Sequence, residues 1–361
     1  MKKFIGLLLS LALAGSSFAQ MSGYSSSNYS EGTTLGANET LTADGIALGN
    51  AVKLRGYVDF VFGYDDEDIA GTNTQNEQFD TSADVDFLFD LSPITAEVHL
   101  NTDDHNHFEQ VFGRYSVNDD FHVTFGRQLT VLGYEADEAP GLYAVTTAHV
   151  LGDKSDIGVI QDTNGKAIST RRNYVDGVRI NYNNGMFGLT FGLHDGYWSQ
   201  DHFDGDDMAI DIAASVMFFP GLEARLGYAH ESLDEDSTPG ANDGSIGQFN
   251  TWLEYSQGSL TLATELDNYD IDLGTGTDTD YFSWMLLANY QFTDWFAGTI
   301  RYTHEDVETG STNHDSDRFT FATLFTLTQN FGVNVEYSTT SVDSTTQGDY
   351  NEFLVEGLIT Y

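Results

Sequence analysis

Residues 53–64 of the chain read KLRGYVDFVFGY, and they alternate strictly between two kinds of side chain. Leu54, Val58 and Phe60 share one parity with further apolar residues, whereas Arg55 has the opposite parity. Successive side chains of a β-strand point to opposite faces of a sheet. The stretch therefore predicts a strand with one apolar and one polar face.

The same alternation recurs from about residue 53 to the last residue. Clear examples are residues 84–91 (DVDFLFDL), 187–194 (FGLTFGLH) and 331–337 (FGVNVEY). No linker composition interrupts these strands, so we expect residues 51–361 to form one all-β domain. Alternation alone does not distinguish a soluble sandwich from a membrane barrel, because both have two-faced strands.

Three features favour a transmembrane antiparallel β-barrel. The polar rows are rich in Thr, Gly, Asn, Glu and Arg, while the apolar rows carry aromatic residues near the strand ends. Short connections alternate with longer polar ones, as in transmembrane barrels with short turns at one end. The short connections lie at 92–93, 118–120, 183–185, 220–221, 257–258, 293–294 and 329–330, and longer ones at 201–207, 233–245 and 307–317. The third feature is that the chain ends within a strand on Tyr361, which resembles the terminal signature read by the barrel assembly machinery.

Counting these segments predicts about sixteen strands, with fourteen and eighteen left open. A barrel of this size leaves an aqueous channel rather than a packed interior. The expected starts are 53, 82, 94, 107, 121, 173, 186, 208, 221, 247, 259, 281, 295, 317, 331 and 350.

The N-terminal residues predict export. Lys2 and Lys3 precede a short apolar run over residues 4–14, and Ser17-Phe18-Ala19 forms a small-x-small cleavage site. Residues 1–19 are therefore expected to be a signal peptide, and the cell outer membrane to be the destination. Residues 20–50 are rich in Ser, Gly, Asn and Thr; they are expected to be either a flexible N-terminal segment or a weak plug.

The charge balance is strongly acidic. Without Lys2 and Lys3 the chain has 12 basic and 56 acidic residues, a formal net charge of 12 − 56 = −44. Such a charge repels a phosphate backbone, so nucleic-acid binding is excluded. It fits adaptation to a salty habitat, attraction of cations, or both. The absence of cysteine excludes disulfides and thiolate metal sites.

One connection, residues 133–172, is far longer than the others. It begins GYEADEAPGLY, which mixes apolar residues with Glu135, Asp137 and Glu138. A long connection of this kind inside a compact fold is either functional or disordered. The apolar residues favour the first reading, so we expect this third external loop to fold into the lumen.

Here the sequence resembles a known family. TFGRQ at 124–128, followed by Gly133-Tyr134, resembles the fifth strand and constriction loop of general diffusion porins. The run DGVRINY at 176–182 is similar to the strand that follows that loop, and the Gly-Tyr-Glu and Ala-Pro elements resemble the OmpL-like β-barrel porins. In those families the third loop narrows the pore, and its carboxylates face arginines on the wall.

The arginines support a constriction here independently, because five of the nine flank this loop. An arginine that faces lipid at mid-bilayer costs about 2–4 kcal/mol, so strand arginines are expected to point into the lumen on stability grounds alone. This cost does not explain why the arginines cluster around one loop. Arg127 has the parity of the apolar row. Either a bulge at Gly126 turns it inward, which we expect, or its side chain stays outside and reaches a membrane interface. The proposed constriction sets Glu135, Asp137 and Glu138 against Arg55, Arg114, Arg127, Arg171, Arg172 and Arg179.

The resemblance implies a passive channel for small polar solutes and ions in outer-membrane lipid, and a homotrimer. The acidic balance predicts a mild cation preference. A substrate-specific channel for a sugar, peptide or anion stays open, as does a non-conducting structural barrel. No nucleophile motif, metal spacing or nucleotide loop stands in a suitable context, so neither an enzyme nor a cofactor is expected.

Overall fold

The computed structural model describes residues 34–69, 72–102, 108–151, 172–198, 208–233, 243–274, 276–343 and 348–361. These residues form sixteen long strands, β2 to β17, together with the two-residue strand β1 (Ile46–Ala47) and two short 3-10 helices, η1 (Glu39–Leu41) and η2 (Ala139–Gly141). The long strands are β2 (Val52–Ile69), β3 (Thr72–Leu91), β4 (Ile94–Asn101), β5 (Gln110–Ser116), β6 (Phe121–Leu129), β7 (Tyr174–Asn183), β8 (Phe187–His194), β9 (Ala209–Phe219), β10 (Leu222–Leu233), β11 (Gly244–Gln257), β12 (Leu260–Asp272), β13 (Asp278–Thr293), β14 (Phe296–Thr309), β15 (Thr312–Thr328), β16 (Phe331–Asp343) and β17 (Asp349–Thr360).

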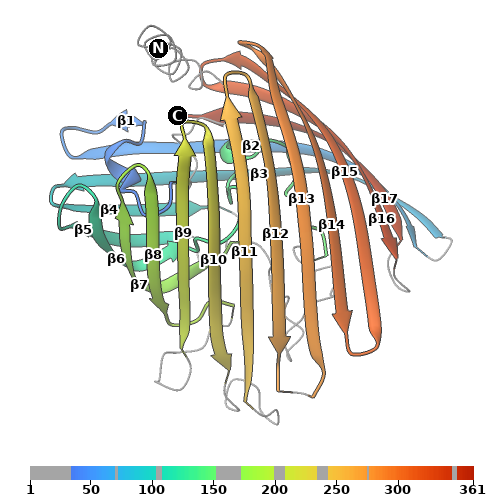
Figure 1. Cartoon of the computed structure of the whole chain (residues 1–361). Coiled ribbons are helices and arrows are strands. Elements are labelled where there is room, and N and C mark those ends of the chain that lie inside the picture. The colour runs from blue at the N-terminus through green and yellow to red at the C-terminus, as the bar shows by residue number, and fades with distance from the viewer. Residues whose placement is uncertain are drawn as a thin grey trace, which may run out of the picture.

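The sheet closes on itself. Each long strand pairs antiparallel with the next, and β17 pairs with β2, for example Val355 opposite Phe62. Closure leaves no unpaired edge, which is the condition for a sheet to cross hydrocarbon. The C-terminus lies at the end of the barrel that carries the short turns (Figure 1). The prediction of an all-β barrel with sixteen strands is confirmed. None of the helices among the described residues is long and apolar enough to span a membrane.

The two faces of the wall differ as the alternation requires. Along β8 the exposed residues Phe187, Leu189 and Phe191 alternate with the buried residues Gly188 and Thr190. Apolar side chains thus form the outer surface, and the polar parity points into the barrel. At the short-turn end of β13 and β14, ring contacts join a band of aromatic residues, as expected at a membrane interface. The band contains Tyr290, Phe292, Trp295, Phe296 and Phe325.

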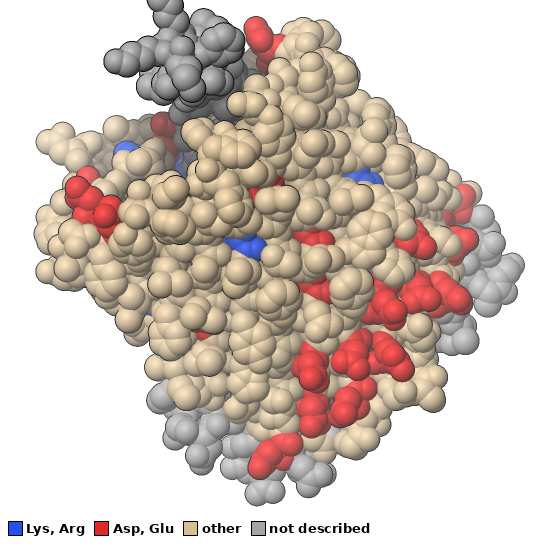
Figure 2. Space-filling view, viewed as in Figure 1, with Lys and Arg blue, Asp and Glu red and all other residues tan. Residues whose placement is uncertain are grey.

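Acidic residues of the outer surface gather at the opposite end. Figure 2 shows carboxylates concentrated toward the loop ends of the barrel, while most of the visible wall carries no charge. Several of them lie directly opposite one another across neighbouring strands, as Asp280 does with Asp270 and Glu308. Like charges in such positions repel, so this region favours dissolved cations nearby.

Two strand starts differ from the predictions by five residues or more, those of β3 and β15. Residues 72–81 belong to β3, which was expected to start at 82, and residues 65–69 belong to β2. Residues 312–317 belong to β15 rather than to the longer connection expected over 307–317. In both places cross-strand pairing continues beyond the apolar rows. The polar side chains there lie past the apolar band, so the backbone keeps its ladder although the hydrophobic signal has ended.

Part of the N-terminal segment contacts the inner wall. Arg114 of β5 donates hydrogen bonds to Asn38 Oδ1 (2.8 Å) and Thr40 Oγ1 (2.5 Å), and Asn183 donates to the carbonyl oxygen of Leu35 (2.7 Å). Residues 34–43 are thus held inside the barrel against β4, β5 and β7. The signal peptide and residues 20–33 lie outside the described residues.

Candidate functional site

The inner loop segment, residues 130–151, follows β6 and contacts the far side of the lumen. Wall carboxylates accept hydrogen bonds from its backbone. Glu336 Oε2 accepts from the amides of Val145 (2.7 Å) and Thr146 (2.9 Å), and Glu305 Oε2 accepts from the amide of Val150 (2.7 Å). Backbone groups without a partner are costly to bury, so these carboxylates replace the partners that a strand would supply.

Two wall arginines hold the carbonyl side of the same segment. Arg301 donates to the carbonyl oxygens of Thr146 and Thr147, both at 2.8 Å, and forms an ion pair with Glu135 at 2.5 Å. Arg318 donates to Thr146 Oγ1 at 3.0 Å. The guanidinium group suits this task because its donors have a fixed planar geometry.

Apolar contacts complete the attachment. Ala148 packs on Met285 of β13, and Val150 belongs to a buried cluster with Tyr269 and Tyr281. These three wall residues are apolar or aromatic at inward-facing positions, which breaks the polar-inward pattern. The inner loop segment covers them, which explains why they are there.

Four of the predicted arginines line one cavity of about 80 Å³: Arg55, Arg114, Arg172 and Arg179. Three of them have buried acidic partners on the wall. Arg55 Nε lies 2.7 Å from Asp86, Arg114 Nη1 lies 3.4 Å from Glu97, and Arg179 Nη2 lies 2.9 Å from Asp211. Burying a charge without a partner is expensive, so the carboxylates are needed to keep this cluster folded.

Arg172 also lines a second, smaller cavity of about 30 Å³ together with Glu135 and Asp137. Its guanidinium donates two hydrogen bonds to the carbonyl oxygen of Thr130, at 2.9 and 2.8 Å. Asp137 accepts a hydrogen bond from the hydroxyl of Tyr174. Arg172 therefore lies between an arginine-lined region and an acidic region of the lumen.

His149, Glu265 and Asp267 line the same small cavity. Burial lowers the pKa of His149, but the nearby carboxylates, Glu265 first among them, outweigh burial and raise it to about 9. At neutral pH the imidazole is thus a counter-charge for Glu265, with Nε2 and Oε2 3.6 Å apart.

Glu138 lies in a second acidic cluster of the described residues. Its carboxylate lies with those of Asp84 and Glu109, and all three are buried with oxygens within 4.8 Å of one another. Glu135 pairs with Arg301 rather than with the arginine cluster. The sequence did not reveal these pairings because it does not show where the loop crosses the lumen.

The predicted inward turn of Arg127 is wrong. β6 keeps its register with β5 and β7, so Arg127 stays on the outer face, where its side chain is 31% exposed and lies 3.2 Å from Asp176. Gly126 has a φ of +115°, but this conformation does not shift the parity of the strand.

The structure nevertheless requires glycine at position 126. A Cβ atom there would lie 2.4 Å from the carbonyl oxygen of Val111, and the positive φ disfavours any L side chain. We expect Gly126→Ala to destabilise the folded barrel by more than about 1 kcal/mol, measured as a lower urea midpoint in lipid vesicles. Gly185→Ala, a turn glycine with a φ of +82° and open space around it, is the control for positive φ alone. Equal losses in both variants would show that the contact with Val111 is unimportant.

Arg171 lies outside the described residues. The residues that the sequence reasoning missed are Arg301, Arg318, Glu305 and Glu336, which hold the inner loop segment. The sequence does carry a sign of them: charged residues occupy inward-facing positions on β14 to β16. These strands lie across the lumen from β6 and β7, which flank the loop.

A closed sixteen-stranded barrel with an apolar outer face, a charged lumen and a loop segment attached inside is the architecture of an outer-membrane porin. The chain has this fold. Solved structures with the same architecture include OmpT of Vibrio cholerae (TM-score 0.61, 13% identity, 87% of this chain and 99% of that one). The DcaP channel of Acinetobacter baumannii matches with a TM-score of 0.62 and 12% identity over 86% of this chain and 97% of that one. OmpF of Salmonella typhi, in complex with daunomycin, matches with a TM-score of 0.62 and 12% identity over 86% and 98%.

At these identities the likeness is one of fold. A comparison with models of known families finds no match. A comparison with curated protein sequences finds none either.

Proposed function

We propose that the chain is a porin of the Gram-negative outer membrane that passes small hydrophilic solutes and ions by passive diffusion. One observation carries this proposal: the barrel is apolar outside and densely charged inside, and the inner loop segment crosses that charged lumen. Charged side chains are costly to bury in a dry barrel, whereas water and ions in a channel can solvate them.

The arrangement of charge supports a constriction. Arg55, Arg114 and Arg179 lie on one side of the lumen, and the inner loop segment brings Glu135 and Asp137 to the neighbouring cavity. Opposite charges across a narrow passage create a transverse field, which orients dipolar solutes and disfavours apolar ones. Glu138 does not line the neighbouring cavity, and its carboxylate lies near those of Asp84 and Glu109.

A mild cation preference fits the balance of charge. The buried arginines are matched by Asp86, Glu97 and Asp211, so they leave little net positive charge in the lumen. On the outer surface near the loops, Asp280 instead lies opposite Asp270 and Glu308, and these like charges raise the local concentration of cations at the mouth.

The proposal is tested in a planar bilayer under a salt gradient. We expect open channels whose reversal potential shows cation preference, and a weaker preference in Glu135→Gln plus Glu138→Gln because two loop charges are removed. Arg127→Gln, on the outer face, should leave the reversal potential unchanged. An unchanged potential in the double variant contradicts the constriction, and a barrel without conductance contradicts the channel.

A substrate-specific channel is the second candidate. The observation in its favour is that the arginine-lined cavity is bordered by residues 34–40 of the N-terminal segment. Flux that saturates steeply with one solute would support it.

One of the similar structures, in-vitro folded OmpT of Vibrio cholerae, is a trimer form, and we propose a homotrimer here. Recognition of Tyr361 by the assembly machinery stays a prediction.

A further inference from the structure

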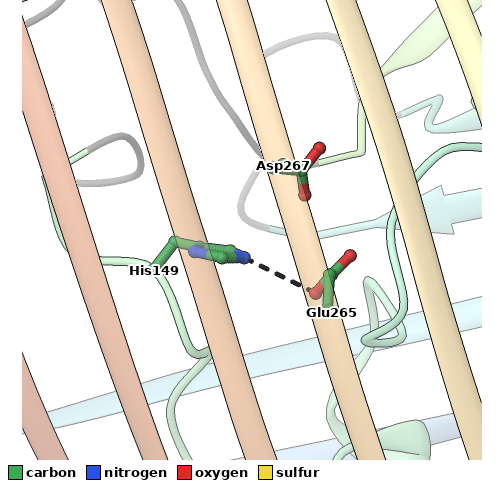
Figure 3. Close-up of side chains that lie close together, drawn as sticks. All are labelled: His149, Glu265 and Asp267. Atoms are coloured by element: carbon green, nitrogen blue, oxygen red, sulfur yellow. Dashed lines mark ion pairs between the residues drawn. The ribbon is translucent and has the colours of Figure 1, made fainter.

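A histidine and two carboxylates meet in the small cavity between the inner loop segment and β12. Figure 3 shows His149 reaching from the loop toward the wall, where Glu265 and Asp267 stand two residues apart on one strand. All three are buried, and one ligand atom from each lies within 4.8 Å of the others.

The separation of the groups suits a shared ion. His149 Nε2 and Glu265 Oε2 are 3.6 Å apart, which is longer than an ordinary hydrogen bond. Two ligands bound at about 2.0–2.1 Å to one tetrahedral ion lie roughly 3.3–3.5 Å apart. A small movement of either side chain would therefore bring His149 and Glu265 to the spacing of two ligands on one ion.

The surrounding hydrogen bonds orient all three candidate ligands. Tyr281 donates its hydroxyl hydrogen to Glu305 (2.9 Å), so its oxygen is left to accept from Nδ1–H of His149 at 3.3 Å. A bound metal ion would displace the Nε2 proton of His149, and this contact at Nδ1 would then leave the Nε2 lone pair directed at the carboxylates, as in a metal-bound histidine.

The carboxylates are supported in the same way. Asn250 donates to both of them, at 2.8 Å in each case, Gln248 donates to Asp267 at 2.8 Å, and the amide of Tyr134 donates to Glu265 at 2.7 Å. Supporting contacts of this kind fix the direction of a ligand and are typical of metal sites.

The cavity between these groups has about 30 Å³, which exceeds the 10–15 Å³ or so that one water molecule needs. It has space for an ion and one bound water. Glu135 and Asp137 also border it, and the positive groups that line it are His149 and Arg172. The net charge of the side chains that line the cavity is therefore negative, which favours the binding of a divalent cation.

We propose that His149, Glu265 and Asp267 bind a divalent transition-metal ion of the zinc class, with the fourth position left to water. A set of one imidazole and two carboxylates favours zinc-like ions over calcium and magnesium, which prefer oxygen ligands throughout. The ion would tie the inner loop segment to β12. This inference does not depend on the proposed channel function.

The experiment uses the untagged, refolded full chain. Co²⁺ is added as a spectroscopic probe, and Zn²⁺ is then titrated in competition. We expect visible d–d absorption that saturates at one ion per chain and is displaced by Zn²⁺ but not by Mg²⁺. His149→Ala should weaken binding by at least about 100-fold, and Tyr281→Phe by about 10-fold, because it removes the contact that orients the ligand.

Two controls keep the outcome specific. His304→Ala removes an outer-face histidine that pairs with Asp317, and Asp84→Asn alters the separate carboxylate cluster. Both should leave the titration unchanged, and heat-modifiable migration on a gel checks that each variant forms the barrel. If His149→Ala does not fold, Asp267→Asn takes its place with the same expectation.

Binding that persists in His149→Ala or is lost in His304→Ala would overturn the assignment. Saturation without dependence on Tyr281 would also contradict it, because the Tyr281 hydroxyl would then not orient the imidazole of His149. No Co²⁺ spectrum in the wild type would show that the three residues form an ion pair only. Channel conductance is not a readout of this test, so its outcome is separate from that of the proposed function.

Discussion

Replacing Arg301 with glutamine is expected to release the inner loop segment from the wall while the barrel stays folded. Arg301 is fully buried and contacts the segment at Glu135, Thr146 and Thr147. Its loss leaves Glu135 buried without its ion-pair partner, and breaking a buried pair in this way costs about 3–5 kcal/mol. The strand itself keeps its backbone ladder, because Arg301 is paired on both sides through main-chain groups.

Hydrogen exchange followed by mass spectrometry measures this release. The amides of Val145, Thr146, Val150 and Leu151 are protected by Glu336 and Glu305. A loss of about 3–5 kcal/mol in attachment predicts that their exchange accelerates by about 100-fold or more. The same variant should show larger and noisier single-channel conductance, because a detached segment no longer narrows the lumen in one position.

Arg127→Gln is the matched control. Arg127 and Asp176 form an exposed pair on the outer face, and such pairs contribute about 0–1 kcal/mol. Exchange in residues 145–151 should not change in this variant. Slow exchange retained in Arg301→Gln would mean that Glu305 and Glu336 hold the segment without the arginine.

Ile300→Arg is expected to destabilise the barrel itself. Ile300 is 49% exposed on the outer face of β14, between aromatic residues at Phe296 and Tyr302. An arginine at mid-bilayer on the lipid face costs about 2–4 kcal/mol. Urea unfolding in lipid vesicles should show this loss in the free energy of unfolding, and refolding yield should fall.

Phe292→Arg tests whether the cost of the charge depends on its depth in the membrane. Phe292 is 58% exposed at the short-turn end of β13, within the aromatic band. Near an interface the charge costs only about 0–1 kcal/mol, because the side chain reaches water. Similar losses at Ile300 and Phe292 would contradict the position of the membrane along the wall.

The sequence predicted the wall well because the wall is a local pattern. Rows such as Phe187, Leu189 and Phe191 repeat with period two, and each row reports its own environment whichever strand lies beside it. The boundaries failed where the alternation ends: residues 65–69 and 72–81 remain in β2 and β3 although their side chains no longer alternate between apolar and polar.

The candidate site was predicted in part. The arginines were assigned to the lumen correctly where parity decides facing, as for Arg55, Arg114 and Arg179, and wrongly at Arg127, where a bulge was expected. The inward-facing aromatic residues Tyr269 and Tyr281 were a readable signal that something covers the wall there.

By itself, the sequence determined that this chain forms a closed two-faced barrel and which side chains face water. Strand periodicity is a property of neighbouring residues, so it can be read without knowing the fold. Only the tertiary structure decided which wall residues the inner loop segment meets. Arg301, the partner of Glu135, and Glu265, the partner of His149, are each more than a hundred residues away in the sequence. The neighbours of Glu138 are set by where the segment crosses the lumen. No local pattern encodes that crossing, because it depends on burying many distant groups at once.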